Sequence, residues 1–557
     1  MKRIGILLVV FMLLLGMLVL GDGVKYGGIL KLGGNAPTQI VAGFNPFVPN
    51  NDIAIPLVYE PLFYVNPLNG SYTPLLATSY EWENNNLKMV VTIRRDVKWN
   101  DGVPFTPEDV AFTFNFLKKY PVLDTQGVWS TVSALQSVEA SGDDVIFTFS
   151  KSNIPESYFI FQVYIVPEHI WSKIEDPITF INSENPVGTG PFLRTSYSVS
   201  GGIEILKKNP NYWWEGRPYV DEIEYMNNIS NEAAFLQLLK GENVENDIAI
   251  NNPQQTWVAK DPQHNELWWP VESVNMLYLN TQKAPFNNPI FRKAIALAIN
   301  KKLLEDEAYW GTGGYDISQT AVIPGQRSEW YDTSLASEDA YLSSYNPTEA
   351  QKLLESIGYK KNASGMLVGP DGKQLPTFYI LDGPGWTDFM TMGQIISQEL
   401  KDIGINAVLQ PENYGAYLKT LSAGYYDMAV GHAWIGASIG PTPFYFYYNQ
   451  FNPSYSATEI GKTVISDFSR YTNPEITKAL QEYTSSSDIS VQKQAMYTIE
   501  KIMIEDLPLI VLTNRTGFDL YSSKEFVGWP SSDDPYSLGA PGNNTNFEMV
   551  ALNVHLR

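Results

Sequence analysis

The residue types that most often carry enzyme chemistry are absent or scattered in this sequence. With no cysteine in the chain, a thiol nucleophile, a disulfide framework and a thiolate zinc site are excluded. The four histidines stand far apart and none belongs to an HExxH motif, which argues against a zinc site. They are His169, His264, His432 and His555.

Two further patterns resemble catalytic motifs only in part. Gly461-Lys462-Thr463 ends like a phosphate-binding loop, but Ser456 occupies the position of the first glycine. A glycosidase needs two carboxylates about 5–10 Å apart, and among 60 acidic residues no local motif marks such a pair. We therefore predict no catalytic residue, no metal site and no cofactor, and expect a binding protein rather than an enzyme.

The charge of the chain narrows its partners. The formal net charge is −22, which repels polyanions, so nucleic acid and anionic membrane surfaces are poor partners and no nucleic acid is expected. Only 18% of residues are charged, against about 25% in an average soluble protein. Neutral polar groups and aromatic rings must therefore form much of the surface.

The N-terminus has the pattern of an export signal. Lys2 and Arg3 precede the apolar run Ile4–Leu20, which is followed by small and polar residues. We expect residues 1–21 to be a signal peptide and the mature chain to be periplasmic or extracellular, with an uncleaved membrane anchor as the alternative. No cysteine follows the apolar run, so a lipoprotein is not expected.

The elements alternate between strands and helices, and 557 residues are too many for one core, so a mixed α/β protein of two or three lobes is expected. Strands are predicted at Lys88–Ile93, Val145–Phe149, Ile203–Leu206, Met276–Leu279 and Ile405–Leu409. Helices are predicted to begin at Pro107, Pro289 and Pro347, and around Met392. The third of these is expected to end at Gly358 and the fourth at Gly404.

Five blocks, in order along the chain, resemble the family 5 extracellular solute-binding proteins. These are the oligopeptide, dipeptide and nickel receptors of ABC importers. The blocks are Leu75–Lys118, Pro186–Phe192 with Asn209–Trp213, Asn288–Asn300, Tyr345–Tyr359 and Leu507–Leu512.

This resemblance implies a bilobal periplasmic-binding-protein fold with an extra domain and the ligand in the interlobe cleft. The first lobe would comprise residues 24–60, 181–273 and 509–557, the extra domain 61–180 and the second lobe 274–508. Crossing strands near Val274–Leu279 and Leu509–Thr513 would form the hinge. A monomer that delivers its ligand to the membrane permease of an ABC importer is expected.

The segment Gly424–Pro441 resembles the ligand-proximal stretch of that family. Peptide-binding members place an aspartate there for the α-ammonium of the peptide, and the matching residue is Ala437. A second family aspartate is replaced by Gly440. An ammonium buried without its counter-charge costs several kcal/mol, so these departures favour an uncharged ligand.

Aromatic and amide side chains supply the remaining candidates for ligand contact. Trp434 and Trp386 could stack on sugar rings, with packing in the core as the alternative. Trp257 and the pair Trp268-Trp269 are weighed against burial in the same way. The full set of candidate ligand-binding residues is Trp434, Trp386, Asn251, Asn252, Gln254, Asn45, Asn51, Trp257, Ala437 and His432.

We therefore predict an extracytoplasmic receptor that captures an oligosaccharide, such as a fragment of a β-linked glycan, for an ABC importer. An oligopeptide receptor of the same family is the first alternative. A secreted glycoside hydrolase with an aromatic cleft is the second.

Overall fold

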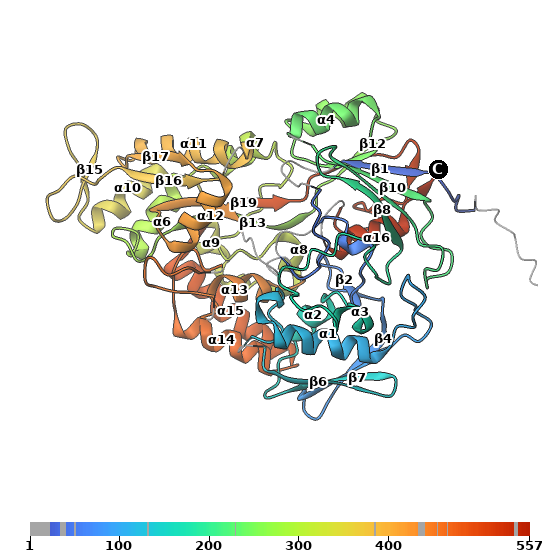
Figure 1. The fold of residues 1–557 in the computed structure, drawn as a ribbon. Helices are drawn as coiled ribbons and strands as arrows, with labels where there is room; N and C mark the ends of the chain where they lie inside the picture. Colours follow the sequence, from blue (N-terminus) through green and yellow to red (C-terminus); the bar gives the residue numbers. More distant parts are fainter. Residues whose placement is uncertain are drawn as a thin grey trace, which may run out of the picture.

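The computed structural model describes residues 23–33, 40–48, 52–130, 133–228, 230–383, 386–432, 440–453, 455–464, 466–539 and 544–557. Two mixed sheets organise the chain, and a smaller antiparallel sheet stands beside them (Figure 1). We call the part built on the seven-stranded sheet the first lobe and the part built on the five-stranded sheet the second lobe.

The first lobe contains a sheet drawn from distant parts of the sequence. Its central strand β1 pairs in parallel with β10 and β11, and the outer strands pair antiparallel. In spatial order the strands are β12 (Asn265–Trp268), β20 (Asp519–Ser522), β11 (Glu245–Asp247), β1 (Ile29–Gly33), β10 (Glu222–Met226), β9 (Ile203–Lys208) and β8 (Phe192–Ser198). The helices of this part are α4 (Asn231–Lys240), α5 (Pro253–Thr256) and α16 (Thr545–Asn553).

The second lobe contains the other mixed sheet, with β16 parallel to both β17 and β18. Its order is β17 (Ala407–Pro411), β16 (Phe378–Asp382), β18 (Met428–His432), β13 (Val271–Leu279) and β19 (Leu509–Thr516). The helices are α6 (Pro289–Ala298), α7 (Lys301–Ala308), α8 (Pro324–Trp330), α9 (Ala336–Ser343), α10 (Pro347–Ser356), α11 (Thr387–Asp402), α12 (Tyr414–Ala423), α13 (Pro443–Phe451), α14 (Pro474–Ser485) and α15 (Ile489–Asp506).

The chain passes between the two sheets twice, at neighbouring places. β12 leads through Trp269 and Pro270 into β13, and β19 leads through Gly517 and Phe518 into β20. The backbone N–H of Gly517 donates to the carbonyl of Pro270 at 3.0 Å, which joins the two passages. Figure 1 shows β13 and β19 in the middle of the molecule, between the helices of the second lobe and the strands of the first.

The third sheet is a four-stranded antiparallel unit at the lower right of Figure 1. It comprises β4 (Ala77–Glu83), β5 (Lys88–Ile93), β7 (Asp144–Phe149) and β6 (Leu135–Ser141), and the helices of this region are α1 (Pro107–Lys119), α2 (Glu156–Phe161) and α3 (Glu168–Trp171). The remaining strands form three pairs: β2 (Phe63–Val65) with β3 (Tyr72–Pro74), β14 (Lys360–Lys361) with β15 (Leu367–Val368), and β21 (Phe526–Val527) with β22 (His555–Leu556).

The local signals read from the sequence explain several helix ends. Asn288 and Asn346 cap α6 and α10, because their side-chain oxygens accept hydrogen bonds from the backbone of Ile290 and Glu349. Gly358 and Gly404 follow α10 and α11 with φ of +90° and +94°, a conformation that a residue with Cβ adopts at a cost. Helix α11 begins at Thr387, five residues before the Met392 expected from its apolar stripe.

Within the described ranges, no helix combines the length and the apolar character needed to cross a bilayer.

Candidate functional site

A cavity of about 420 Å³ lies between the two lobes, beside the strands that join them. The first lobe lines it with the start of α4, Ala249–Asn251 and Thr256. The second lobe lines it with the end of α7, Trp310 and the first turns of α11. A cavity that takes its walls from two lobes changes shape whenever the lobes move relative to each other.

The first-lobe wall is fixed by hydrogen bonds among its own residues. The side-chain amide of Asn231 donates to the carbonyl of Ala249 at 3.2 Å, and the hydroxyl of Thr256 donates to the carbonyl of Asn251 at 2.9 Å. Phe235 lies on the same wall, edge-on to Trp257 with ring centroids 6.4 Å apart. The wall therefore offers one aromatic ring and several neutral hydrogen-bonding groups at fixed positions.

Trp310 is the aromatic residue of the opposite wall, and it connects the lobes. Its neighbour Tyr309 is buried in the core of the second lobe, whereas the Trp310 side chain packs against a first-lobe cluster that includes Ile250 and Trp257. The backbone of Trp310 has φ of +54°, a left-handed conformation that is costly for a bulky residue. Such strain concentrates at functional sites, where surrounding structure enforces it.

The loop after Trp310 is held from two directions. The backbone N–H of Gly313 donates to the Glu305 carboxylate at 2.7 Å, and the carbonyl of Gly313 accepts from the Asn514 side chain of β19 at 2.9 Å. The position of Trp310 is therefore coupled both to α7 and to one of the strands that join the lobes.

Near the strands that join the lobes, an ion pair and a hydrogen bond engage three charged side chains. Arg515 Nε of β19 lies 3.3 Å from Glu272 Oε1 of β13. Asp388, in the first turn of α11, accepts a hydrogen bond from the Tyr309 hydroxyl at 3.3 Å. Burial raises the pKa of both Glu272 and Asp388, and the positive charge of Arg515 opposes that rise.

The candidates taken from residues 251–257 lie in different surroundings. Asn251 lines the cavity. Asn252 precedes α5 with φ of +49°, and Gln254 is exposed on α5, outside the cavity lining. Trp257 is 3% exposed, and its indole N–H donates to the carbonyl of Glu266 at 2.9 Å, so it supports the wall from behind.

Two other candidates pack against the protein itself. Trp386 precedes α11 and is partly buried against both main hydrophobic clusters, edge-on to Phe389 with ring centroids 5.5 Å apart. Asn45 is fully buried, and its amide donates to the carbonyls of Pro177 and Phe180 at 3.1 and 2.9 Å. These contacts give Asn45 a role in fixing a loop.

The Trp268-Trp269 pair also has packing roles. The indole N–H of Trp268 donates to the carbonyl of Ser537 at 3.1 Å. Trp269 is 7% exposed and packs edge-on against Phe518, with ring centroids 5.2 Å apart.

The remaining candidates fall outside the described residues or at their edge. Asn51, Trp434 and Ala437 are outside them. His432 is the last residue of β18, where its backbone pairs with Asn275, and its side chain is not described. The ligand contacts expected of these residues stay predictions.

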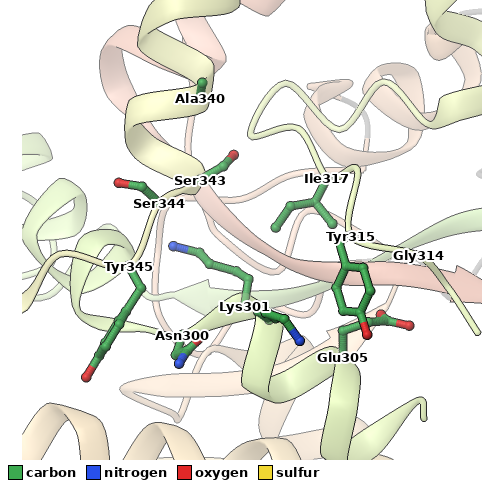
Figure 2. Close-up of a pocket in the computed structure, with 11 residues that line it drawn as sticks. Asn300, Lys301, Glu305, Gly314, Tyr315, Ile317, Ala340, Ser343, Ser344 and Tyr345 are labelled. Atoms are coloured by element: carbon green, nitrogen blue, oxygen red, sulfur yellow. The ribbon is translucent and has the colours of Figure 1, made fainter. Parts of the chain in front are cut away.

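A second cavity, of about 390 Å³, lies within the second lobe between α7 and α9 (Figure 2). Its lining includes the buried Lys301, whose ammonium donates to the carbonyls of Ala296 and, at 3.2 Å, of Leu342. These carbonyls belong to the last turns of α6 and α9, where a cation is favoured. Burial lowers the pKa of Lys301 to about 7.

Sequence reasoning missed Trp310, Phe235, Asp388 and Thr391 as lining residues. One signal was available for Trp310, since it stands directly before the glycine-rich segment Gly311–Gly314. Among the described residues, no three His, Cys, Asp or Glu side chains are placed to hold a metal ion together.

Two α/β lobes, joined by paired crossing strands and enclosing a polar and aromatic cavity, define a bilobal periplasmic-binding-protein fold. Residues 71–456 match the model of the bacterial extracellular solute-binding proteins, family 5, middle region. Because this match covers more than half of the chain, the chain belongs to family 5 of the extracellular solute-binding proteins, which serve ABC importers. The prediction of a binding protein rather than an enzyme is thereby confirmed.

Relatives within this family differ in the ligands that their names give. The nickel-binding periplasmic protein of Escherichia coli K12 is 27% identical, over 72% of this chain and 75% of its own length. The oligopeptide-binding protein AppA of Bacillus subtilis 168 is 25% identical, over 78% and 77%. A periplasmic oligopeptide-binding protein of Thermotoga maritima, solved with bound mannohexaose, is 28% identical with a TM-score of 0.81, covering 95% of this chain and 98% of that chain.

Proposed function

We propose that the protein is exported by residues 1–21, captures an oligosaccharide in the cavity between its lobes, and delivers it unaltered to the permease of an ABC importer. The observation that carries this proposal is the composition of the cavity walls. Phe235 and Trp310 face the cavity from opposite lobes, and amides and hydroxyls surround them. Sugar rings present apolar C–H faces to aromatic rings and hydroxyls to polar groups, so this combination suits them.

Two further points support a sugar. A relative with 28% identity over nearly the whole chain was solved with mannohexaose bound. Ala437 stands where peptide receptors of the family carry an aspartate, so a peptide would lack that partner for its ammonium group. Within the proposal, Trp434 and Trp386 contribute further stacking surfaces.

An oligopeptide remains the alternative ligand, and one observation favours it. Glu232, Glu307 and Asp388 line the cavity, and a carboxylate there could pair with a peptide ammonium in place of the missing aspartate. The two ligand classes make different demands on the same wall, so direct binding measurements separate them.

The test is calorimetry on the purified mature chain with mannohexaose, other neutral hexasaccharides and a panel of di- to pentapeptides. We expect saturable one-to-one binding of a sugar, and chromatography after overnight incubation should return the sugar intact. Tight binding of a peptide with no measurable sugar binding would overturn the proposed ligand. Repeated conversion of the sugar to shorter products would overturn the proposed class of activity.

A further inference from the structure

The charged residues that line the interlobe cavity all carry the same sign. Glu232 comes from the first turn of α4, Glu307 from the last turn of α7 and Asp388 from the first turn of α11. The lining contains no lysine, arginine or histidine among the residues that the structure describes. Both lobes therefore contribute negative charge to the same cavity, in which Glu232 and Glu307 are exposed to solvent.

The nearby cation does not offset this charge. Arg515 already lies 3.3 Å from Glu272, and its positive charge is shared with Asp388 in the hydrogen-bonded group that includes Tyr309. Glu232 and Glu307 form no ion pair with any residue in the described part of the chain. An anionic ligand would meet these two carboxylates without a compensating cation.

We propose that the cavity selects uncharged sugar rings and rejects acidic ones, because Glu232, Glu307 and Asp388 accept hydrogen bonds from ligand hydroxyls and repel ligand carboxylates. This inference rests on the proposed function and specifies its substrate class. Carboxylates suit the task, since each offers two acceptor oxygens and hydrogen bonds to ionised acceptors are stronger than neutral ones. The formal net charge of −22 adds a long-range repulsion of anions in the same direction.

The experiment compares mannohexaose with hexagalacturonate, an acidic sugar of the same length, by calorimetry at pH 7 and at two salt concentrations. The wild-type protein should bind mannohexaose at least about tenfold more tightly, which corresponds to about 1.4 kcal/mol. Raising the salt concentration should narrow the gap by strengthening the binding of the acidic sugar, because screening weakens repulsion between charges.

The variant Glu232→Gln/Glu307→Gln should reduce the ratio of the two affinities several-fold. Removing the two carboxylates should strengthen binding of the acidic sugar more than it weakens binding of the neutral one. The control variant Glu215→Gln/Glu355→Gln changes the net charge equally at exposed residues outside the lining, and should leave the gap as it is. If both variants reduced the affinity ratio equally, net charge alone would account for the preference for the neutral sugar. That result would overturn the proposed role of the cavity carboxylates.

The possible failures are distinguishable. If both sugars bind the wild-type protein equally well, the selection against acidic rings is wrong and the oligosaccharide receptor stands. If no sugar binds and a peptide does, the proposed function itself is wrong, and this inference is wrong with it.

Discussion

The cavity within the second lobe and the cavity between the lobes are similar in volume and differ in how their charges are compensated. In the first, the buried Lys301 donates to carbonyls at the ends of two helices of the same lobe. In the second, Glu232 and Glu307 come from different lobes and lack partners of opposite charge. Hydrogen bonds within one lobe hold Lys301 in place, whereas the carboxylates of Glu232 and Glu307, which line a cavity shared by two lobes, are available to a ligand.

The largest expected effect, and the strongest test of the interlobe cavity as the ligand site, comes from Trp310→Ala. Loss of the indole should weaken mannohexaose binding by about 10- to 100-fold, or roughly 1.4–2.8 kcal/mol, since buried tryptophans dominate many interfaces. Calorimetry measures the affinity, and thermal unfolding of the ligand-free protein measures stability. Trp268→Ala is the matched control, because Trp268 donates to Ser537 away from the cavity lining and should affect stability alone. Equal effects of both variants on affinity would contradict the assignment of Trp310.

The structural role of the cavity within the second lobe is tested with Lys301→Met. The pKa of Lys301 is about 7 in the folded protein and about 10.5 in the unfolded chain, so between these values the unfolded state binds one proton more. The free energy of unfolding of the wild type should therefore rise relative to the variant by about 2 kcal/mol between pH 7 and pH 9. Urea denaturation at several pH values measures this difference. Sugar affinity should stay within about twofold, and a loss of binding would show that this cavity serves the ligand.

The smallest expected effect tests where the binding surface of the interlobe cavity ends. Asn251 lines it and Gln254, three residues later, does not. Asn251→Ala should weaken sugar binding by about 3- to 10-fold through the loss of a hydrogen bond of about 1 kcal/mol, and Gln254→Ala should leave it unchanged. Calorimetry on both variants suffices. A loss of affinity at Gln254 would extend the binding surface onto α5.

The sequence predicted the fold class well because its signals are local. Pro107, Pro289 and Pro347 mark the starts of three helices, and Lys88–Ile93 is a strand with the bounds expected. The binding-protein class is confirmed by the family to which the chain belongs. The domain boundaries stay a prediction, since they depend on how separate segments are grouped.

The residues of the cavity were harder to predict because the cavity forms only when the lobes meet. Phe235 and Trp310 are 75 positions apart, and nothing in the sequence around either residue indicates that they share a space. Trp257 and Asn45 looked like equally good candidates, yet hydrogen bonds to Glu266 and to Pro177 engage them within the protein. Burial and partner choice are properties of the tertiary structure, and residue type alone does not report them.

The packing of Trp310 across the joint bears on the rates at which a solute enters and leaves. Separating the lobes would expose the part of the indole that now contacts the first lobe, at about 1 kcal/mol for each ~40 Å² of apolar surface. The contact therefore favours the arrangement of the lobes in which Trp310 touches the first lobe, and any arrangement with the lobes separated is populated less. The same contact must break before a bound solute can leave through separation of the lobes. One side chain would therefore slow the entry of a solute and also slow its release.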